Sequence, residues 1–217
     1  MFTKYASGQT ISNNRNISAF SSLNRRTISA TRSIAALTKV THACTELDTH
    51  ADSIVAGANC CLMHYTTREC DVSPYRDDYA SIKNVPIVQA ATAYQSPYTG
   101  QVYILILNEA LWMGDSMKHT LINPNQLRHY GVKVQDNPCS NEPMHIMTEV
   151  SNFNLELKMR GTTIFADTYT PSEKELHDCP HIIMSSPHEW NPHTVQFHSH
   201  ALKFEDEMTQ HYNIICL

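Results

Sequence analysis

Residues 1–43 contain no aspartate or glutamate, although the whole chain holds 21 acidic residues. This stretch carries six basic side chains, those of Lys4, Arg15, Arg25, Arg26, Arg32 and Lys39. It is rich in serine, threonine and asparagine and poor in large apolar residues, so ordering it would bury too little surface to offset the lost chain entropy. We therefore expect a disordered basic tail or linker over residues 1–43.

Three roles are open for this tail. Its lysines and arginines could make a weak contact with nucleic acid by neutralising phosphates. Its Arg- and Ser-rich, acid-free composition is also typical of a mitochondrial transit peptide. The third role is that of a solvated linker.

Long apolar runs are also missing. None approaches the roughly 18–20 residues that cross a bilayer, and no secretory signal peptide is recognisable. The seven cysteines are an odd number, and free thiols in a reducing compartment explain them most simply. We expect a soluble, intracellular protein that makes no membrane contact.

What is present favours one β-rich domain with flanks. A chain of 217 residues accommodates a domain of about 100–150 residues, and 41% of its residues are hydrophobic. We expect strands over 54–56, 60–65, 85–94, 101–107, 153–159 and 161–166. The turn string 96–100 predicts a hairpin between the third and fourth of these strands. In the core only 125–130 predicts a helix, and order should decline after Pro171.

The candidate site is the hexapeptide Leu47-Asp48-Thr49-His50-Ala51-Asp52. An apolar residue followed by Asp-Thr-x-Ala resembles the catalytic loop of retroviral-type aspartic proteases, the retropepsins. In that family the Asp lies at the tip of a loop, the Thr hydroxyl bonds the equivalent loop of a second subunit, and a small third residue admits substrate backbone. His50 stands where the family has glycine. The alternative for Asp48 is a surface turn or a helix cap.

A second segment extends the resemblance. In retropepsins a short helix after the catalytic loop reads apolar-apolar-Gly-x-x-x-Leu, and this chain offers Leu121-Ile122-Asn123-Pro124-Asn125-Gln126-Leu127. Asn123 replaces the glycine, and asparagine is the non-glycine residue that best tolerates a left-handed backbone. Pro124 fits the first turn of a helix, and Gly131 fits its C-terminal stop.

The apolar run 102–113 lies between these two segments and resembles a passage in copia-type retrotransposon polyproteins. The resemblance covers residues 44–135 and points to a Gag-Pol fragment with a retropepsin-type protease. It implies an all-β, closed acid-protease barrel with one short helix over 44–136. A C-terminal extension, partly β and partly disordered, would follow over 137–217. The hairpin at 96–100 would be, or would support, the flap over bound peptide.

The resemblance further implies an aspartic endopeptidase without a cofactor. Such enzymes need two carboxylates that share a proton. A chain with a single convincing motif must borrow the second carboxylate from another copy, which implies a homodimer. Asp48 would be catalytic, and a polyprotein or peptide substrate would contact Thr49, His50, Ala51 and Asp52. The cytoplasm or a retroelement particle would be its location.

Other functions stay open. His50 favours a non-catalytic relic that acts as an interaction segment, and the basic tail favours a Gag-like nucleic-acid binder. A second Asp-Thr pair, Asp167-Thr168, could supply the missing carboxylate in a two-lobed protease, although Tyr169 and a nearby proline fit the motif poorly.

No metal site is expected. The zinc-knuckle spacing Cys-x2-Cys-x4-His-x4-Cys is missing from the sequence. A group of potential ligands is close in sequence but wrongly spaced for a structural zinc site; it consists of Cys60, Cys61, His64 and Cys70.

Overall fold

The structure is a computed structural model that describes residues 2–5, 43–73, 79–148 and 153–197. Strands dominate this part of the chain, which confirms the all-β prediction. In chain order the elements are β1 (Phe2–Tyr5), β2 (Thr45–Leu47), β3 (Val55–Gly57), β4 (Cys61–Ser73), β5 (Ile82–Gln95), β6 (Val102–Gly114), β7 (Thr120–Ile122), α2 (Pro124–His129), β8 (Lys133–Gln135), β9 (His145–Thr148), β10 (Phe153–Glu156), β11 (Lys158–Arg160), β12 (Thr163–Ala166), α3 (Glu173–Asp178) and β13 (His181–Ile183). No helix among the described residues is long and apolar enough to span a bilayer.

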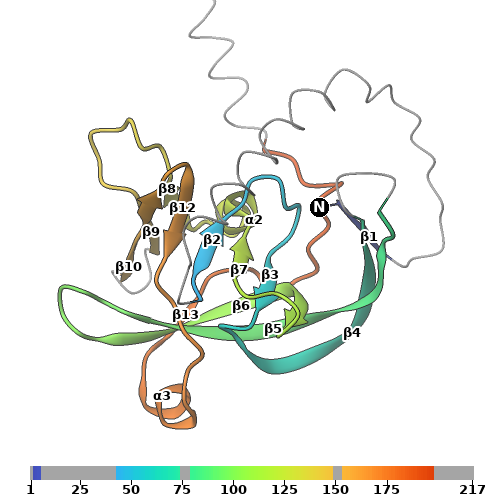
Figure 1. Ribbon diagram of the computed structural model, residues 1–217, viewed down its shortest axis with the longest axis horizontal. Helices are drawn as coiled ribbons and strands as arrows, with labels where there is room; N and C mark the ends of the chain where they lie inside the picture. The colour runs from blue at the N-terminus through green and yellow to red at the C-terminus, as the bar shows by residue number, and fades with distance from the viewer. Residues whose placement is uncertain (1, 6–42, 74–78, 149–152, 198–217) are drawn as a thin grey trace, which may run out of the picture.

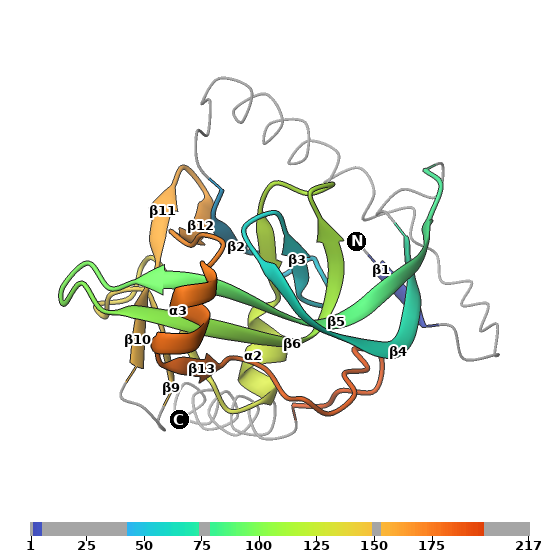
Figure 2. The ribbon, with the colours of Figure 1, turned by 90° about the horizontal axis from the view of Figure 1, so that it is seen from below.

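Ten strands form the main sheet, in the order β1-β4-β5-β6-β3-β7-β2-β12-β11, and β13 also pairs with β6. The long antiparallel strands β4, β5 and β6 curve beneath the shorter ones (Figure 1; Figure 2). A separate three-stranded sheet holds β8, β9 and β10. The predicted hairpin is confirmed as β5–β6. Gly100 closes its turn by donating its N–H to the Ser96 carbonyl at 2.9 Å.

The main sheet does not close on itself. Within the described ranges its end strands β1 and β11 pair with β4 and β12 and not with each other. The predicted closed barrel is therefore wrong, and α3 adds a second helix to the one expected. One edge of the long strand β6 is shared between β13 and β3.

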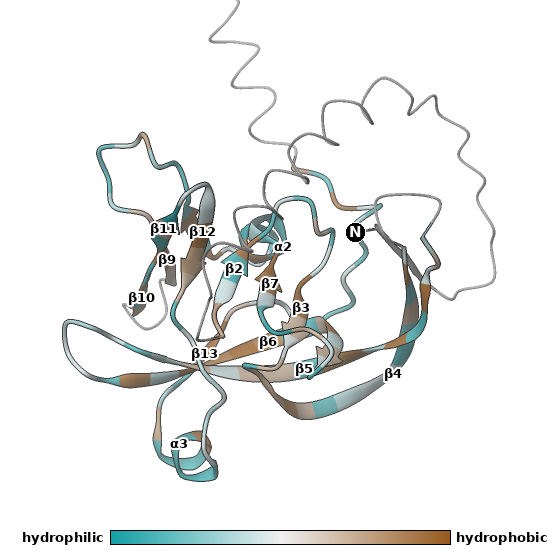
Figure 3. Ribbon diagram, viewed as in Figure 1, coloured by the Kyte–Doolittle hydropathy of each residue, from teal (hydrophilic) through white to brown (hydrophobic). Residues whose placement is uncertain are grey.

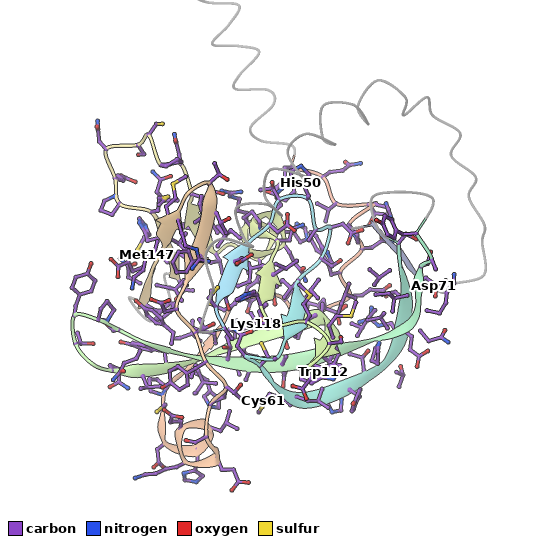
Figure 4. All side chains as sticks on the ribbon, in the orientation of Figure 1. His50, Cys61, Asp71, Trp112, Lys118 and Met147 are labelled. Atoms are coloured by element: carbon purple, nitrogen blue, oxygen red, sulfur yellow. The ribbon has the colours of Figure 1, made fainter. Side chains whose placement is uncertain are left out.

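Three short strands position the candidate site. β7 lies between β2 and β3, parallel to β2 and antiparallel to β3. The connection 48–54, which joins β2 to β3, therefore passes the end of β7 from which α2 begins. Figure 4 shows His50 at this end of the three strands and Lys118 at the opposite end.

The β5–β6 turn lies far from this connection. Leu111 of β6 pairs with Val55, the first residue of β3, and the stretch of strand from Val102 to Leu111 spans roughly 30 Å. In the turn, the Tyr98 hydroxyl donates to Glu156 Oε1 at 3.3 Å, beside the three-stranded sheet. The prediction that this hairpin covers the site as a flap is therefore wrong, although the other end of β6 does support the site.

The main core fills the space between β5–β6 and the short strands. Its most deeply buried large side chains are those of Ile54, Leu105, Leu107, Ile122, Leu127, Ile146, Phe153, Leu155 and Met184. Figure 3 shows β3, β6 and β7 coloured mainly as hydrophobic. Because alternate strand residues face opposite sides, Val55, Ile87 and Leu111 form a second cluster on the other face.

The C-terminal segment belongs to the same sheet. β12 pairs with β2 and β13 pairs with β6, so the main sheet crosses the division predicted at residue 136. The predicted strand 153–159 is split between two sheets, as β10 and β11, and β11 pairs with β12, which lies within the predicted strand 161–166. The expected loss of order after Pro171 is wrong as far as residue 197. There Ser172 is the N-cap of α3, and its side chain forms a capping box with Glu175.

The predicted tail has one structured part. Phe2–Tyr5 forms β1, which pairs with the last residues of β4, so the prediction of disorder over the whole of 1–43 does not hold for this strand. Residues 6–42, to which the rest of that prediction applies, lie outside the described residues.

Candidate active site

The 48–54 loop begins as a continuation of β2. Asp48 donates its N–H to the Ile122 carbonyl at 3.0 Å, which adds one bond to the β2–β7 pairing. The Asp48 carboxylate then accepts the His50 N–H at 2.8 Å. Such a bond from an aspartate to the N–H two residues on stabilises a tight turn. The candidate catalytic residue, Asp48, thus stabilises the turn of the chain with its own side chain.

The loop presents one side to solvent and the other to the core. Thr49 and His50 are exposed, and the Asp48 side chain is 33% exposed. Ala51 is 2% exposed and Ile54 is fully buried. The tip of the loop is therefore a partly exposed carboxylate followed by two exposed side chains, so another molecule can contact it.

The His50 ring lies beside this carboxylate. Its Nδ1 is 3.8 Å from Asp48 Oδ1, and its side chain is 75% exposed. When the ring is protonated it places a positive charge next to the carboxylate, and in either state its bulk occupies part of the approach to Asp48.

Helix α2 holds the inner side of the loop. Asn123 donates from Nδ2 to the Ala51 carbonyl at 2.7 Å, and Gln126 Oε1 accepts the Ile54 N–H at 2.8 Å. Asn123 is also the N-cap, because its Oδ1 accepts the N–H groups of the first turn. One side chain thus both starts the helix and fixes the loop.

The backbone of Asn123 differs from the expectation. Its φ of −75° and ψ of 112° are extended rather than left-handed, because an N-cap residue takes non-helical, β-region angles. The predictions for the flanking residues are confirmed, since Pro124 occupies the first turn and Gly131, with φ +89°, follows the helix.

A buried carboxylate supports the loop from beneath, and the sequence analysis misses it. Glu109 of β6 forms an ion pair with Arg68 of β4 and accepts the Trp190 N–H at 3.0 Å. The Trp190 indole donates to the Asp52 carbonyl at 3.0 Å, and Gln126 Nε2 donates to the Glu109 carbonyl at 3.3 Å. The sequence does contain one signal for it, because Glu109 is a charged residue inside the apolar run of β6, and a buried charge needs a partner.

The second Asp-Thr pair is not part of this site. Its neighbour Ala166 pairs with Thr45 at the start of β2, whereas Asp48 follows the end of β2, roughly 13 Å away along the strands. The Asp167 carboxylate instead binds Lys158 Nζ at 2.7 Å. The two-lobed alternative, in which Asp167 faces Asp48 within one chain, is therefore wrong.

Among the described residues, Cys60, Cys61, His64 and Cys70 do not form a group of potential metal ligands. Burial raises the pKa of Cys60 to about 11 and that of Cys70 to about 12, so both are protonated thiols at neutral pH. In the described ranges the cluster of three potential metal ligands within mutual reach is a different one, namely Cys44, Glu46 and His119.

Comparisons of the chain with family models, with curated proteins and with solved structures find no match. The function therefore has to be argued from the site.

We predict that Asn123→Ala destabilises the fold by about 2–3 kcal/mol, because it removes both the helix cap and the donor to the Ala51 carbonyl. Asn123→Ser keeps a good cap but cannot reach Ala51, so it should cost about 1 kcal/mol less than the alanine variant. Urea unfolding of the three proteins measures both values. Equal stabilities for the serine and alanine variants would show that the cap contributes nothing.

Proposed function

We propose that this chain is an aspartic endopeptidase of the retropepsin type, active as a homodimer on polypeptide substrates such as a retroelement polyprotein. The observation that carries the proposal is the contact between the two halves of the motif. Ala51 and Asn123 are 72 residues apart in sequence and are joined by a hydrogen bond, as are Ile54 and Gln126. The proposal rests on this loop and helix and does not require a closed barrel.

The chemistry needs two Asp48 side chains. One carboxylate takes a proton from the attacking water as a general base, while the other, protonated, donates to the scissile carbonyl oxygen. Two carboxylates about 3 Å apart cannot both ionise, so they share one proton and titrate as a pair. Each chain contributes one such group, and a two-fold axis between the loop tips brings the pair together.

The exposure of the loop tip supports this assembly. Thr49 is exposed beside Asp48, so its hydroxyl is free to bond the equivalent loop of a second copy. Ala51 is buried and leaves room at the loop, and Asp52 follows as the candidate acceptor for substrate backbone. His50 takes the place through which substrate backbone would approach.

A non-catalytic relic is the second candidate, and the observation that favours it is the His50 ring 3.8 Å from the Asp48 carboxylate. In this alternative the loop and helix persist as an interaction module while the ring blocks the substrate. A weak nucleic-acid contact of the basic N-terminal stretch, and a location in the cytoplasm or in a retroelement particle, are compatible with both candidates.

Asp48→Asn should abolish peptidase activity and leave the fold unchanged. The amide cannot act as a base, but its Oδ1 can still accept the His50 N–H that shapes the turn. Asp167→Asn is the matched control, because it alters the other Asp-Thr pair at an exposed salt bridge. Cleavage of a fluorogenic peptide library at acid pH, with and without pepstatin, measures activity, and circular dichroism checks the fold. Full cleavage by Asp48→Asn would overturn the proposal.

Mixing experiments test the dimer. If each copy supplies one carboxylate, an excess of Asp48→Asn should trap wild-type chains in inactive mixed dimers. The activity per wild-type chain should therefore decrease as the proportion of Asp48→Asn in the mixture increases. Adding Asp167→Asn in the same excess should not inhibit. Undiminished activity in the Asp48→Asn mixture, under conditions in which subunits exchange, would mean that one chain is sufficient.

His50→Gly should increase kcat/KM for peptides with bulky side chains, because it removes the ring beside Asp48. His50→Gln keeps most of the bulk of the ring, so it should not share this gain. Equal kcat/KM values of the three proteins for bulky peptides would show that the ring does not obstruct the substrate.

A further inference from the structure

Cys44, Glu46 and His119 form a compact cluster at the end of β2 and β7 that lies opposite the Asp48 loop. Cys44 Sγ is 3.2 Å from His119 Nδ1 and 3.8 Å from Glu46 Oε1. All three potential ligand atoms lie within 4.8 Å of one another. In Figure 4, Lys118, the residue before His119, marks this end of the strands.

Strand register brings the cluster together. β2 and β7 are parallel with Thr45 opposite Thr120, so the preceding residues, Cys44 and His119, are also neighbours. Cys44 and Glu46 are two residues apart and share one face of β2. Because Cys44 and His119 are 75 residues apart in sequence, a search for local metal-binding spacings cannot find them.

The backbone fixes the histidine in place. Thr120 donates its N–H to the Cys44 carbonyl at 3.2 Å, and the Cys44 N–H in turn donates to His119 Nδ1 at 3.1 Å. Behind the cluster, a Cβ added at Gly57 would lie 2.5 Å from the His119 carbonyl oxygen, so the two backbones are in close contact there. Cys44 and His119 thus directly precede the paired strands β2 and β7, and Glu46 lies within β2.

We propose that Cys44, Glu46 and His119 bind one zinc ion through sulfur, a carboxylate oxygen and Nδ1, with the fourth position open to water. A tetrahedral zinc site has ligand atoms about 3.3–3.6 Å apart, given its bond lengths of roughly 2.0–2.3 Å. The distances from Cys44 Sγ to His119 Nδ1 and to Glu46 Oε1 are within a few tenths of an ångström of this separation. A thiolate, an imidazole and a carboxylate together favour zinc over the harder ions calcium and magnesium.

Charge and burial around the thiol determine how the ion would bind. Burial, followed by the nearby Glu46 carboxylate, raises the pKa of Cys44 to about 11, while Arg160 opposes and Asp167 adds to this effect. The thiol is thus protonated at neutral pH, which argues against a reactive nucleophile. Zinc binding would replace the thiol proton, so one proton leaves as the Zn–S bond forms. His119 Nδ1 would exchange the hydrogen bond from the Cys44 N–H for the metal.

The bound ion would stabilise the strand pair. The site links β2 to β7 at the end remote from Asp48, and it contains no residue assigned to the peptidase reaction. Zinc should therefore raise the melting temperature of the full chain in a concentration-dependent manner, and the loss of the ion should leave the chemistry at Asp48 intact. Failure of this proposal would not affect the proposed function, since the two sites share no residue.

The test is titration of the full chain with Zn²⁺ and Co²⁺. We expect one ion per chain, a sulfur-to-cobalt charge-transfer band, and proton release on zinc binding, measured by calorimetry in two buffers of different ionisation enthalpy. Cys44→Ser should abolish the band, and His119→Gln should weaken zinc binding by more than about tenfold. The matched controls are Cys139→Ser and His177→Gln, which change an exposed cysteine and an exposed histidine outside the cluster.

Three results would overturn the proposal. They are the absence of zinc binding, a cobalt band that survives Cys44→Ser, and zinc binding without release of a thiol proton. The last result needs only the wild-type chain, so it holds even if a variant fails to fold. A survival of the band in Cys44→Ser would assign the ion to other cysteines of the chain.

Discussion

The 48–54 loop leaves β2 and reaches β3 without a neighbouring strand along its middle, so its backbone polar groups need other partners. Helix α2 supplies them, because the Asn123 and Gln126 side chains bond the Ala51 carbonyl and the Ile54 N–H. An amide side chain carries both a donor and an acceptor, so Asn123 can cap the helix and hold the loop at once. The helix N-cap, Asn123, also directly follows Ile122, which accepts the Asp48 N–H. A displacement of α2 would therefore move the candidate catalytic carboxylate as well.

Glu109 explains why the C-terminal segment belongs to the site. A buried carboxylate is costly unless it is paired and hydrogen-bonded. The backbone of Glu109 also has a positive φ of 55°, which a non-glycine residue adopts at a cost. Its partners are Arg68 and the Trp190 N–H, and the same tryptophan bonds the Asp52 carbonyl. Without the segment that contains Trp190, both the carboxylate and the loop would lose a partner. The segment that the sequence predicts to be a C-terminal extension thus supplies Trp190, which holds the loop in place.

The parts of this fold that the sequence predicts are those with local signals. Pro124 and Gly131 bracket α2, and the turn at 96–100 joins β5 to β6, each within a few residues. The open sheet has no such signal, because it depends on β13 lying parallel to β6 and on β12 pairing with β2, partners that are distant in sequence. The same holds for the site. The loop residues could be found from one hexapeptide, whereas Glu109 and Trp190 become neighbours only through tertiary packing. The resemblance predicts the wrong backbone region for Asn123, because the family has glycine at this position, whereas the Asn123 side chain caps the helix in an extended conformation.

The β2–β7 pair is three residues long and carries different chemistry at its two ends. At one end α2 fixes the backbone and leaves the Asp48 side chain partly exposed. At the other end the Cys44 N–H bonds the His119 ring, and the nearby Asp167 is already paired with Lys158. Among the described residues, the other Asp-Thr pair is therefore separated from Asp48 by the length of the strand. In the proposed mechanism the shared-proton pair at this loop is completed by a second molecule, so a test of activity is at the same time a test of assembly.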